Sequence, residues 1–266
     1  EGRHPNLFVH TNGLVYANGR DRAVTWMNST AWGRPIVPRS GYIVEFNALY
    51  YNAKKFYQQL LVDDGRTERL ITAERIEAEC RQFEESFRAT FVNHCGYLFD
   101  YVDGGNADWS VRPNQLLAIA LDFSPLTLRE RKAVLDICTR ELKTPKGIRS
   151  LSPKSQGYTP YYAGHQEDRD RAYHQGTAWP WLTGFYLEAY LRVYRMSGVN
   201  YIERQLIGFE EELFYHCIGT IPELFDGNPP FSGRGAISFA MNVSSILRAF
   251  RQLEKHRLEE EAAERD

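Results

Sequence analysis

Cysteine is scarce in this chain, which has four among its 266 residues. No two of them have the CxxC spacing of a zinc-binding pair, and none has a histidine at metal-ligand spacing. Cys80, Cys138 and Cys217 fall in stretches with helical periodicity, where buried free thiols are expected. We therefore expect neither a metal site nor another cofactor.

Long apolar runs and an excess of one charge are also missing. No apolar run approaches the roughly 18–20 residues of a membrane span. The net charge is −2, and acidic and basic residues are mixed along the chain, which argues against a nucleic-acid partner or an electrostatic membrane anchor. The start, Glu1-Gly2-Arg3-His4-Pro5, does not resemble a signal peptide. A reducing cytoplasm is the expected location.

Aromatic residues are abundant, at 14% of the chain. Many Tyr and Trp residues lie beside Asn, Gln, Arg or Gly instead of in apolar runs. Flat rings suit the C–H faces of sugars, and amides suit their hydroxyl groups, so this pattern favours a carbohydrate cleft; an aromatic-rich core is the alternative. The densest stretch is 172–181, Ala-Tyr-His-Gln-Gly-Thr-Ala-Trp-Pro-Trp, which we expect to start a helix facing a flat, polar ligand.

Helical periodicity predicts about seven helices and hardly any strand, apart from a short strand or two around Leu14–Tyr16. Thr72 is the expected N-cap of the second helix, and Thr127 with Glu130 has the spacing of a capping box. The expected helices span 44–61, 72–93, 113–121, 127–142, about twenty residues ending near 197, 201–217, and a last one from about 237.

Long polar-aromatic loops alternate with short connections along the chain. In a ring of helical hairpins, this alternation places the long loops at one end, where they form a cleft. No repeat of fixed period is present, which disfavours a solenoid. The expected long loops are 1–42, 96–111, 143–172 and 221–230.

Several motifs occur in an order that resembles the C-terminal, amylo-α-1,6-glucosidase domain of glycogen debranching enzymes. The likeness runs from about Asn12 to Phe250. Each motif is weak alone, but chance does not easily produce them all in register. The motifs are Thr25-Trp26-Met27, Pro38-Arg39, the stretch from Glu45 to Asn52, Arg112-Pro113-Asn114-Gln115, the stretch from Thr144 to Leu151, the stretch from His174 to Trp181, and Glu223-Leu224-Phe225-Asp226-Gly227.

The resemblance implies an all-α fold, an (α/α)6 barrel related to the glucoamylases. It also implies hydrolysis of α-1,6-linked glucose stubs of glycogen or limit dextrin, with inversion and without a metal. A complete barrel of this kind has more than seven helices. We therefore expect residues 1–266 to form a single, N-terminally incomplete domain, the C-terminal portion of the barrel. Its open side is expected to pair with the missing segment or with another chain.

An inverting glycosidase needs a general acid and a general base, roughly 6.5–9.5 Å apart. By resemblance, Glu223 is the base. The family's acid is an Asp after Thr-Trp-Met, where this chain has Asn28, and an amide cannot donate a proton. Three explanations are open: a natural or engineered loss of activity, a substitute acid, or glucan binding without cleavage. The candidate substitutes are Glu45, Asp100 and Asp103.

Further side chains have sugar-binding roles by resemblance. Rings that would stack on sugars are Trp26, Tyr161, Trp179 and Trp181. Groups that would bond hydroxyls are Arg39, Asn47, Arg112, Asn114, Gln115, Arg149, His174 and Gln175. The structural alternatives are core packing for the rings, an ion pair for Arg112 and a helix cap for His174.

Other functions compete with this interpretation. The strongest is a non-catalytic α-glucan-binding module, which Asn28 favours. Another (α/α)6 hydrolase, trehalase-like or mannosidase-like, is a second. A terpene-cyclase-like helical protein is a third, although the chain lacks an Asp-rich metal motif.

Overall fold

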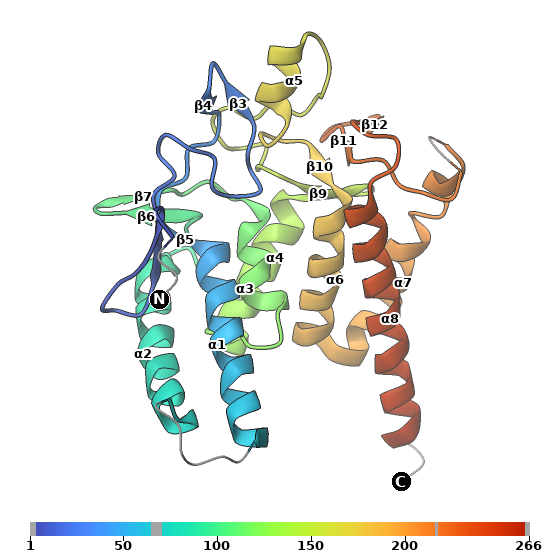
Figure 1. Cartoon of the computed structure of the whole chain (residues 1–266). Helices are drawn as coiled ribbons and strands as arrows, with labels where there is room; N and C mark the ends of the chain where they lie inside the picture. Colours follow the sequence, from blue (N-terminus) through green and yellow to red (C-terminus); the bar gives the residue numbers. More distant parts are fainter. Residues whose placement is uncertain (1–3, 65–70, 216–217, 264–266) are drawn as a thin grey trace. The chain divides into compact units, whose positions relative to one another are not determined.

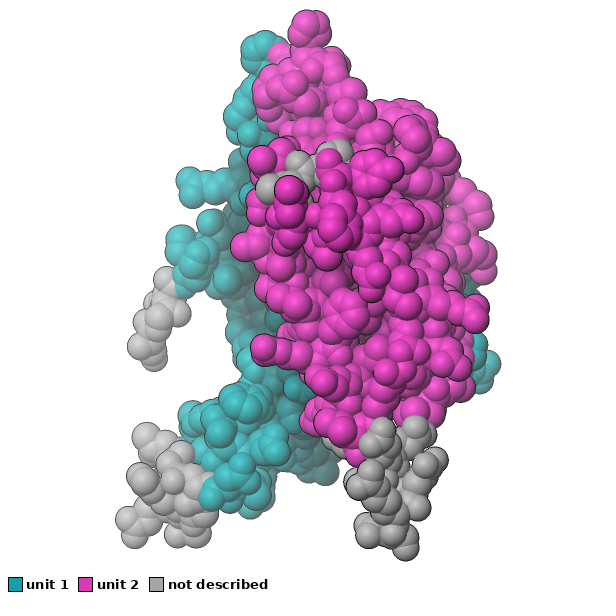
Figure 2. Space-filling view, turned by 90° about the vertical axis from the view of Figure 1, so that its right-hand side faces the viewer, with its two compact units in different colours: residues 1–110, 114–134 teal, residues 111–113, 135–266 magenta. Residues whose placement is uncertain are grey.

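The computed structural model describes residues 4–64, 71–215 and 218–263. These residues group into two compact units (Figure 2): residues 1–110 with 114–134 form unit 1, and residues 111–113 with 135–266 form unit 2. The predictions for the first three residues, for Cys217 and for the end of the helix predicted over 201–217 lie outside the described residues.

The two longest helices of unit 1 form an antiparallel pair (Figure 1), α1 (Val44–Asp64) and α2 (Ala73–Phe91). In α2 the buried residues recur every three or four positions, giving one apolar stripe: Ile76, Cys80, Phe83, Phe87 and Phe91. The Thr72 side chain accepts a hydrogen bond from the Arg75 N–H, as its predicted role as N-cap requires. Cys80 and Cys138 are buried free thiols, which confirms that prediction.

Two shorter helical segments follow, and all of their residues except Pro113 belong to unit 1. The 3-10 turn η1 (Pro113–Leu116) leads into α3 (Leu117–Ala120). Helix α4 (Leu128–Glu141) begins in unit 1 and ends in unit 2. Thr127 and Glu130 bond each other's N–H groups, so the predicted capping box is confirmed.

Unit 1 also contains a five-stranded antiparallel sheet, ordered β1-β2-β5-β6-β7. Its strand β5 continues directly into α1. At Gly41, where φ is +98°, a Cβ atom would lie 2.2 Å from the Val102 carbonyl oxygen, so only glycine fits there. The strands are β1 (Leu7–Val9), β2 (Val15–Ala17), β5 (Gly41–Ile43), β6 (Tyr101–Asp103) and β7 (Asn106–Ala107), and a separate hairpin is formed by β3 (Thr30–Ala31) and β4 (Arg34–Pro35).

In unit 2, helix α6 (Pro180–Tyr194) packs along α8 (Ala240–Ala263) (Figure 1). The approach is close at Gly184, where a Cβ atom would lie 2.1 Å from the Ser245 Oγ. A second five-stranded sheet has the order β12-β11-β10-β9-β8, and β10 leads into α6. The remaining elements are α5 (Gln166–Ala172), η2 (Arg195–Gly198), α7 (Val199–Ile207), η3 (Glu211–Phe214), β8 (Lys143–Thr144), β9 (Gly147–Arg149), β10 (Ala178–Trp179), β11 (Leu224–Phe225) and β12 (Gly233–Arg234).

All seven predicted helices are present, but the expectation of hardly any strand is wrong, because the described residues form two five-stranded sheets and a hairpin from strands too short to show alternation. Three details of the helices also differ. The helix predicted from 172–181 begins only at Pro180, because Gly176 has a φ of +140° that no helix allows and Pro180 suits a first helical position. Helix α5 lies inside the predicted loop 143–172, and α7 ends at Ile207. No helix in the described part of the chain is long and apolar enough to cross a membrane.

Candidate active site

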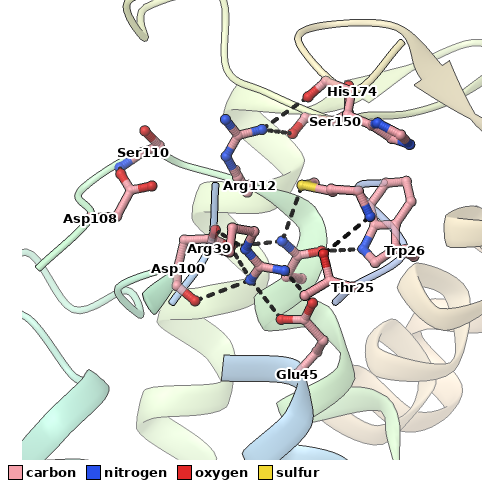
Figure 3. A network of polar contacts seen from close by, with 12 residues as sticks. Thr25, Trp26, Arg39, Glu45, Asp100, Asp108, Ser110, Arg112, Ser150 and His174 are labelled. Atoms are coloured by element: carbon pink, nitrogen blue, oxygen red, sulfur yellow. Dashed lines mark hydrogen bonds and ion pairs between the residues drawn. The ribbon is translucent and has the colours of Figure 1, made fainter. Parts of the chain in front are cut away.

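A buried ion-pair cluster lies in unit 1 at the start of α1 (Figure 3). The Arg39 guanidinium donates to Asp100 at 2.7 and 3.0 Å and to both Glu45 oxygens, one of them at 2.7 Å. All three side chains are buried. Burial acts to lower the pKa of Arg39, but the charges of Asp100 and Glu45 outweigh it and raise that pKa. Arg39 is therefore permanently charged, and its single positive charge is shared by two buried carboxylates that water cannot solvate.

Asn114 extends this cluster to the Thr-Trp-Met motif. Its Nδ2 donates to Asp100 at 2.7 Å and lies 3.7 Å from the Met27 sulfur, while its Oδ1 accepts from the Trp26 indole N–H at 2.6 Å. Met27 and Asn114 are fully buried, and Trp26 is half-buried. The sequence-predicted residues Trp26, Arg39, Glu45 and Asn114 thus belong to one hydrogen-bonded network.

Replacing Arg39 with Met is expected to destabilise the fold by about 3–5 kcal/mol, because two buried carboxylates lose their counter-charge. The measurement is urea-induced unfolding of the parent and the variant. Arg20→Met is the matched control, since the Arg20 side chain is 75% exposed. Equal unfolding midpoints for the Arg39 and Arg20 variants would contradict the role given to the cluster.

Two other unit 1 residues that were predicted to bind sugar form hydrogen bonds with main-chain groups. The Asn47 amide accepts from the Val15 N–H at 2.7 Å and donates to the carbonyls of Val15 and Ile43, both at 3.0 Å. The Gln115 Oε1 accepts from the Leu98 N–H at 3.2 Å. Both side chains are buried. The Asn47 amide thus stabilises the main chain of β2 at Val15, and Gln115 stabilises the main chain at Leu98. Contact of either side chain with a sugar stays a prediction.

Asn28 is exposed and directly follows the buried Met27, and its N–H bonds the Trp26 carbonyl at 2.9 Å. The three substitute acids are engaged elsewhere. Glu45 and Asp100 are ion-paired with Arg39, and Asp103 accepts from Tyr16 at 2.9 Å and pairs with Arg20 at 3.1 Å. Donating a proton would require Glu45 or Asp100 to give up a buried ion pair.

Glu223 in unit 2 is half-buried and held from several sides. Its Oε1 accepts from the Tyr173 hydroxyl, and its Oε2 accepts from the Ala236 N–H at 2.8 Å. Its own N–H bonds the Ala236 carbonyl at 2.9 Å, and the buried Asn242 amide donates to its carbonyl at 2.8 Å. At Gly235, a Cβ atom would lie 2.3 Å from Oε2. These contacts fix the direction of the carboxylate.

The ring of Tyr173 connects Glu223 to the motif that begins α6. Burial, and then its hydrogen bond to Glu223, raise the pKa of Tyr173, so its hydroxyl remains a proton-bearing donor. The ring lies edge-on to His174 at 4.5 Å and to Trp179 at 5.0 Å between centroids. His174 and Trp179 stack with their planes 7° apart at 5.6 Å.

Arg112 holds the turn that follows α5 (Figure 3). Its guanidinium donates to the carbonyls of Ser150 at 3.2 Å and His174 at 3.0 Å, and to the Gln175 Oε1 at 2.8 Å. Unit 2 therefore brings together the predicted residues Arg112, His174, Gln175, Trp179 and Glu223. His174 lies one residue beyond Tyr173, which is the C-cap of α5.

Acidification is expected to destabilise the protein through His174. Burial, and secondarily the charge of Arg112, lower its pKa from 6.5 to about 3. Between these values the unfolded chain binds a proton that the folded chain does not. The contribution is therefore complete above pH 6.5 and is lost as the pH falls toward 3, by at most about 1.4 kcal/mol per pH unit.

Urea unfolding at several pH values in this window measures the effect. His174→Asn should lower the slope of stability against pH, whereas His94→Asn, at an exposed histidine, should not. Parallel slopes for the parent and the His174 variant would refute the assignment.

The other predicted unit 2 ligands lie outside the aromatic group around Tyr173. Arg149 donates to the Gly227 carbonyl at 2.8 Å, and the hydroxyl of Tyr161, which is 48% exposed, donates to the Pro229 carbonyl at 3.3 Å. Trp181 is buried in α6, edge-on to Phe185 at 5.8 Å.

Sequence analysis gave no role to several residues that shape this region. Tyr173 and Asn242 contact Glu223 directly, and the buried Asp226 accepts from Arg234 at 2.9 Å and from the Tyr162 N–H at 2.8 Å. Asp226 stands in the Glu-Leu-Phe-Asp-Gly motif, which was the available signal. Among the residues that the structure describes, no group of His, Cys, Asp and Glu is arranged to hold a metal ion.

Comparison with solved structures defines the class of fold. The chain is similar to the neutral trehalase of Saccharomyces cerevisiae, with a TM-score of 0.60, 14% identity, and coverage of 86% of this chain and 42% of that one. It is also similar to a mannosylglycerate hydrolase from Thermus thermophilus, with a TM-score of 0.56, 16% identity, and coverage of 79% and 45%. Both are (α/α)6-barrel-like enzymes, so the helices of this chain correspond to part of such a barrel, as predicted.

Sequence comparison gives the family. A family model described as amylo-alpha-1,6-glucosidase matches residues 1–248, and the chain belongs to this family of glycoside hydrolases. The resemblance inferred from the motifs is thereby confirmed. A glycogen debranching enzyme from Saccharomyces cerevisiae is 26% identical over 231 residues, covering 70% of this chain. The chain spans 15% of the length of that yeast protein.

Proposed function

We propose that the protein hydrolyses α-1,6-linked glucosyl branch stubs of glycogen-like glucans with inversion of configuration. The observation that carries the proposal is the arrangement of Glu223, a carboxylate fixed through both oxygens in a chain of this family. Each oxygen retains a lone pair beyond the bond it already accepts. An oriented, half-buried carboxylate of this kind suits a general base.

In the proposed reaction, Glu223 takes a proton from water as the water oxygen attacks the anomeric carbon. The bond from that carbon to the glycosidic oxygen breaks, the leaving oxygen takes its proton from a solvent water molecule, and Glu223 later returns its proton to solvent. Asn28, at the acid position, offers a hydrogen bond but no proton, so we propose that catalysis is weakened. General acid catalysis typically contributes about 10²–10⁴-fold.

The test is release of glucose from a glucosyl-branched limit dextrin by the longest natural form of the chain. Inversion predicts that the first glucose to appear is the β anomer, which NMR detects. Glu223→Gln controls for contaminating enzymes. Release of the α anomer first, or equal release by the Glu223 variant, would refute the proposal.

A non-catalytic α-glucan-binding protein is the second candidate, and Asn28 favours it. It predicts binding of limit dextrin without glucose release. A trehalase-like hydrolase remains an alternative that the same assay separates when trehalose is supplied as substrate. The proposed setting is a reducing cytoplasm, where Cys80, Cys95 and Cys138 would stay free thiols.

We also propose that unit 2 pairs with further helices, supplied by another segment of the barrel or by a second chain. A groove of about 400 Å³ between α7, η3 and α8 has an apolar lining that includes Leu206, Phe209 and Ile246. Leu247 and Phe250, which also line the groove, are 56% and 41% exposed, and the adjacent Ile207 in α7 is 56% exposed. Such a surface favours association, so residues 1–266 on their own should sediment as assemblies larger than a monomer. A monomer that unfolds cooperatively would contradict this proposal.

A further inference from the structure

The sheet of unit 1 carries a row of aromatic side chains on one face. The antiparallel register places Phe8 opposite Tyr16, and Tyr16 opposite Tyr42. Adjacent strand residues point to opposite faces, and the neighbours Ala17 and Ile43 are buried. Phe8 is 50% exposed, and Tyr16 and Tyr42 are half-buried. The row therefore lies on the outward face, away from the core.

Two rings of this row, those of Tyr16 and Tyr42, are held by each other and by the neighbouring His10. Tyr16 and Tyr42 meet edge to face at 5.8 Å, and the exposed His10 stacks on Tyr16 at 5.2 Å. The Tyr42 hydroxyl lies 2.8 Å from the His10 Nδ1 and accepts from the Asn12 amide at 3.3 Å. Side chains that are already held lose little conformational entropy when a ligand binds.

The polar groups at the edge of the row are of opposite charge and paired. The Tyr16 hydroxyl donates to Asp103 at 2.9 Å, and Arg20 pairs with Asp103 at 3.1 Å. This hydrogen bond to Asp103, and then burial, raise the pKa of Tyr16, which keeps its hydroxyl protonated. Since the two charges cancel, the surface suits a neutral ligand better than an anionic polymer.

We propose that this surface, the aromatic row, is a second carbohydrate-binding site that holds a glucan chain through residues that take no part in hydrolysis. The ring of Phe8 would cover sugar C–H faces, and the groups of His10, Asn12, Arg20 and Asp103 would bond hydroxyls. The choice of an α-glucan rests on the proposed function. A branched glucan has many outer chains. A second binding site on the same protein therefore keeps further branch stubs at a high effective concentration near the protein.

Retardation in native gels containing glycogen tests the aromatic row. The double variant Phe8→Ala/Tyr42→Leu should bind glycogen about fivefold to tenfold more weakly, since two rings no longer cover sugar surface. Phe56→Ala is the matched control, because Phe56 is 56% exposed on α1 and belongs to no such row. Hydrolysis of a short branched oligosaccharide should be unchanged in all variants.

Several outcomes would contradict the proposal that the aromatic row binds glucan. These are equal retardation of the parent and the double variant, equal loss in the Phe56 variant, or no retardation of the parent. Conversion of a dimer to a monomer by the double variant, seen by sedimentation, would assign the face to pairing between copies instead. Thermal unfolding checks the fold, and Phe8→Ala alone decides the matter if the double variant unfolds.

The experiments distinguish failure of the proposed hydrolase function from failure of the proposed glucan binding by the aromatic row. If the parent releases no glucose but the double variant still loses glycogen retardation, the proposed hydrolase function is wrong and glucan binding by the aromatic row is supported. If glucose is released and retardation does not depend on Phe8 or Tyr42, the opposite holds.

Discussion

Replacing Asn28 with Asp is expected to raise the rate of glucose release from limit dextrin by about 10²–10⁴-fold. The change adds a titratable proton without altering the shape of the side chain. The backbone that presents it is already anchored, because Met27 is buried and the Trp26 indole is bonded to Asn114. Since Asn28 is exposed, a carboxyl group there costs little stability.

Steady-state assays over a range of pH measure this gain. A carboxyl acting as an acid must be protonated, so a new loss of activity at high pH should accompany the higher rate. Asn18→Asp introduces the same chemical change at another exposed asparagine and should leave the rate unchanged. An unaltered rate in the Asn28 variant would show that this position is not that of the missing acid.

Glu223→Gln is expected to lower glucose release by about 10²–10⁴-fold while leaving α-glucan binding intact. Glutamine fits the same contacts, because its carbonyl oxygen accepts from the Ala236 N–H and its amide donates to the Tyr173 hydroxyl oxygen. It cannot take a proton from water. The fold is thus preserved and only proton transfer is removed.

The experiment is most sensitive in the Asn28→Asp background, where the starting rate is expected to be higher. Glucose release and glycogen binding are measured together on the same preparations. Glu167→Gln, at an exposed position in the first turn of α5, is the control for loss of one negative charge. Equal rates for the Glu223 and Glu167 variants would remove Glu223 from the reaction.

The helices could be predicted where sequence periodicity and capping agree. In α2, the spacing of Phe83, Phe87 and Phe91 and the cap at Thr72 mark the helix without tertiary information. Helix α5 carries no such stripe, because Ala172 is its buried residue. The strands have two or three residues each, too few to show alternation.

The candidate site could be predicted only in part, because its contacts join distant segments. Resemblance pointed to Glu223, but the bond from Tyr173 crosses 50 residues, and that between Arg39 and Asp100 crosses 61. A single sequence contains no signal for such pairings. Sequence reasoning placed Glu45 and Asn47 at a cleft, whereas their contacts are with Arg39 and with main-chain groups.

Strand β5 ends at Ile43 and α1 begins at Val44, so no residue can be inserted or deleted between them without moving one of the two elements. Each added residue turns a helix by about 100°, so a single insertion after Ile43 would carry Glu45 around the helix axis and away from Arg39. The same insertion would shift β5 relative to β2 and β6 or draw α1 away from α2. Length variation among natural relatives should therefore be excluded from this junction and tolerated at the tips of the hairpins.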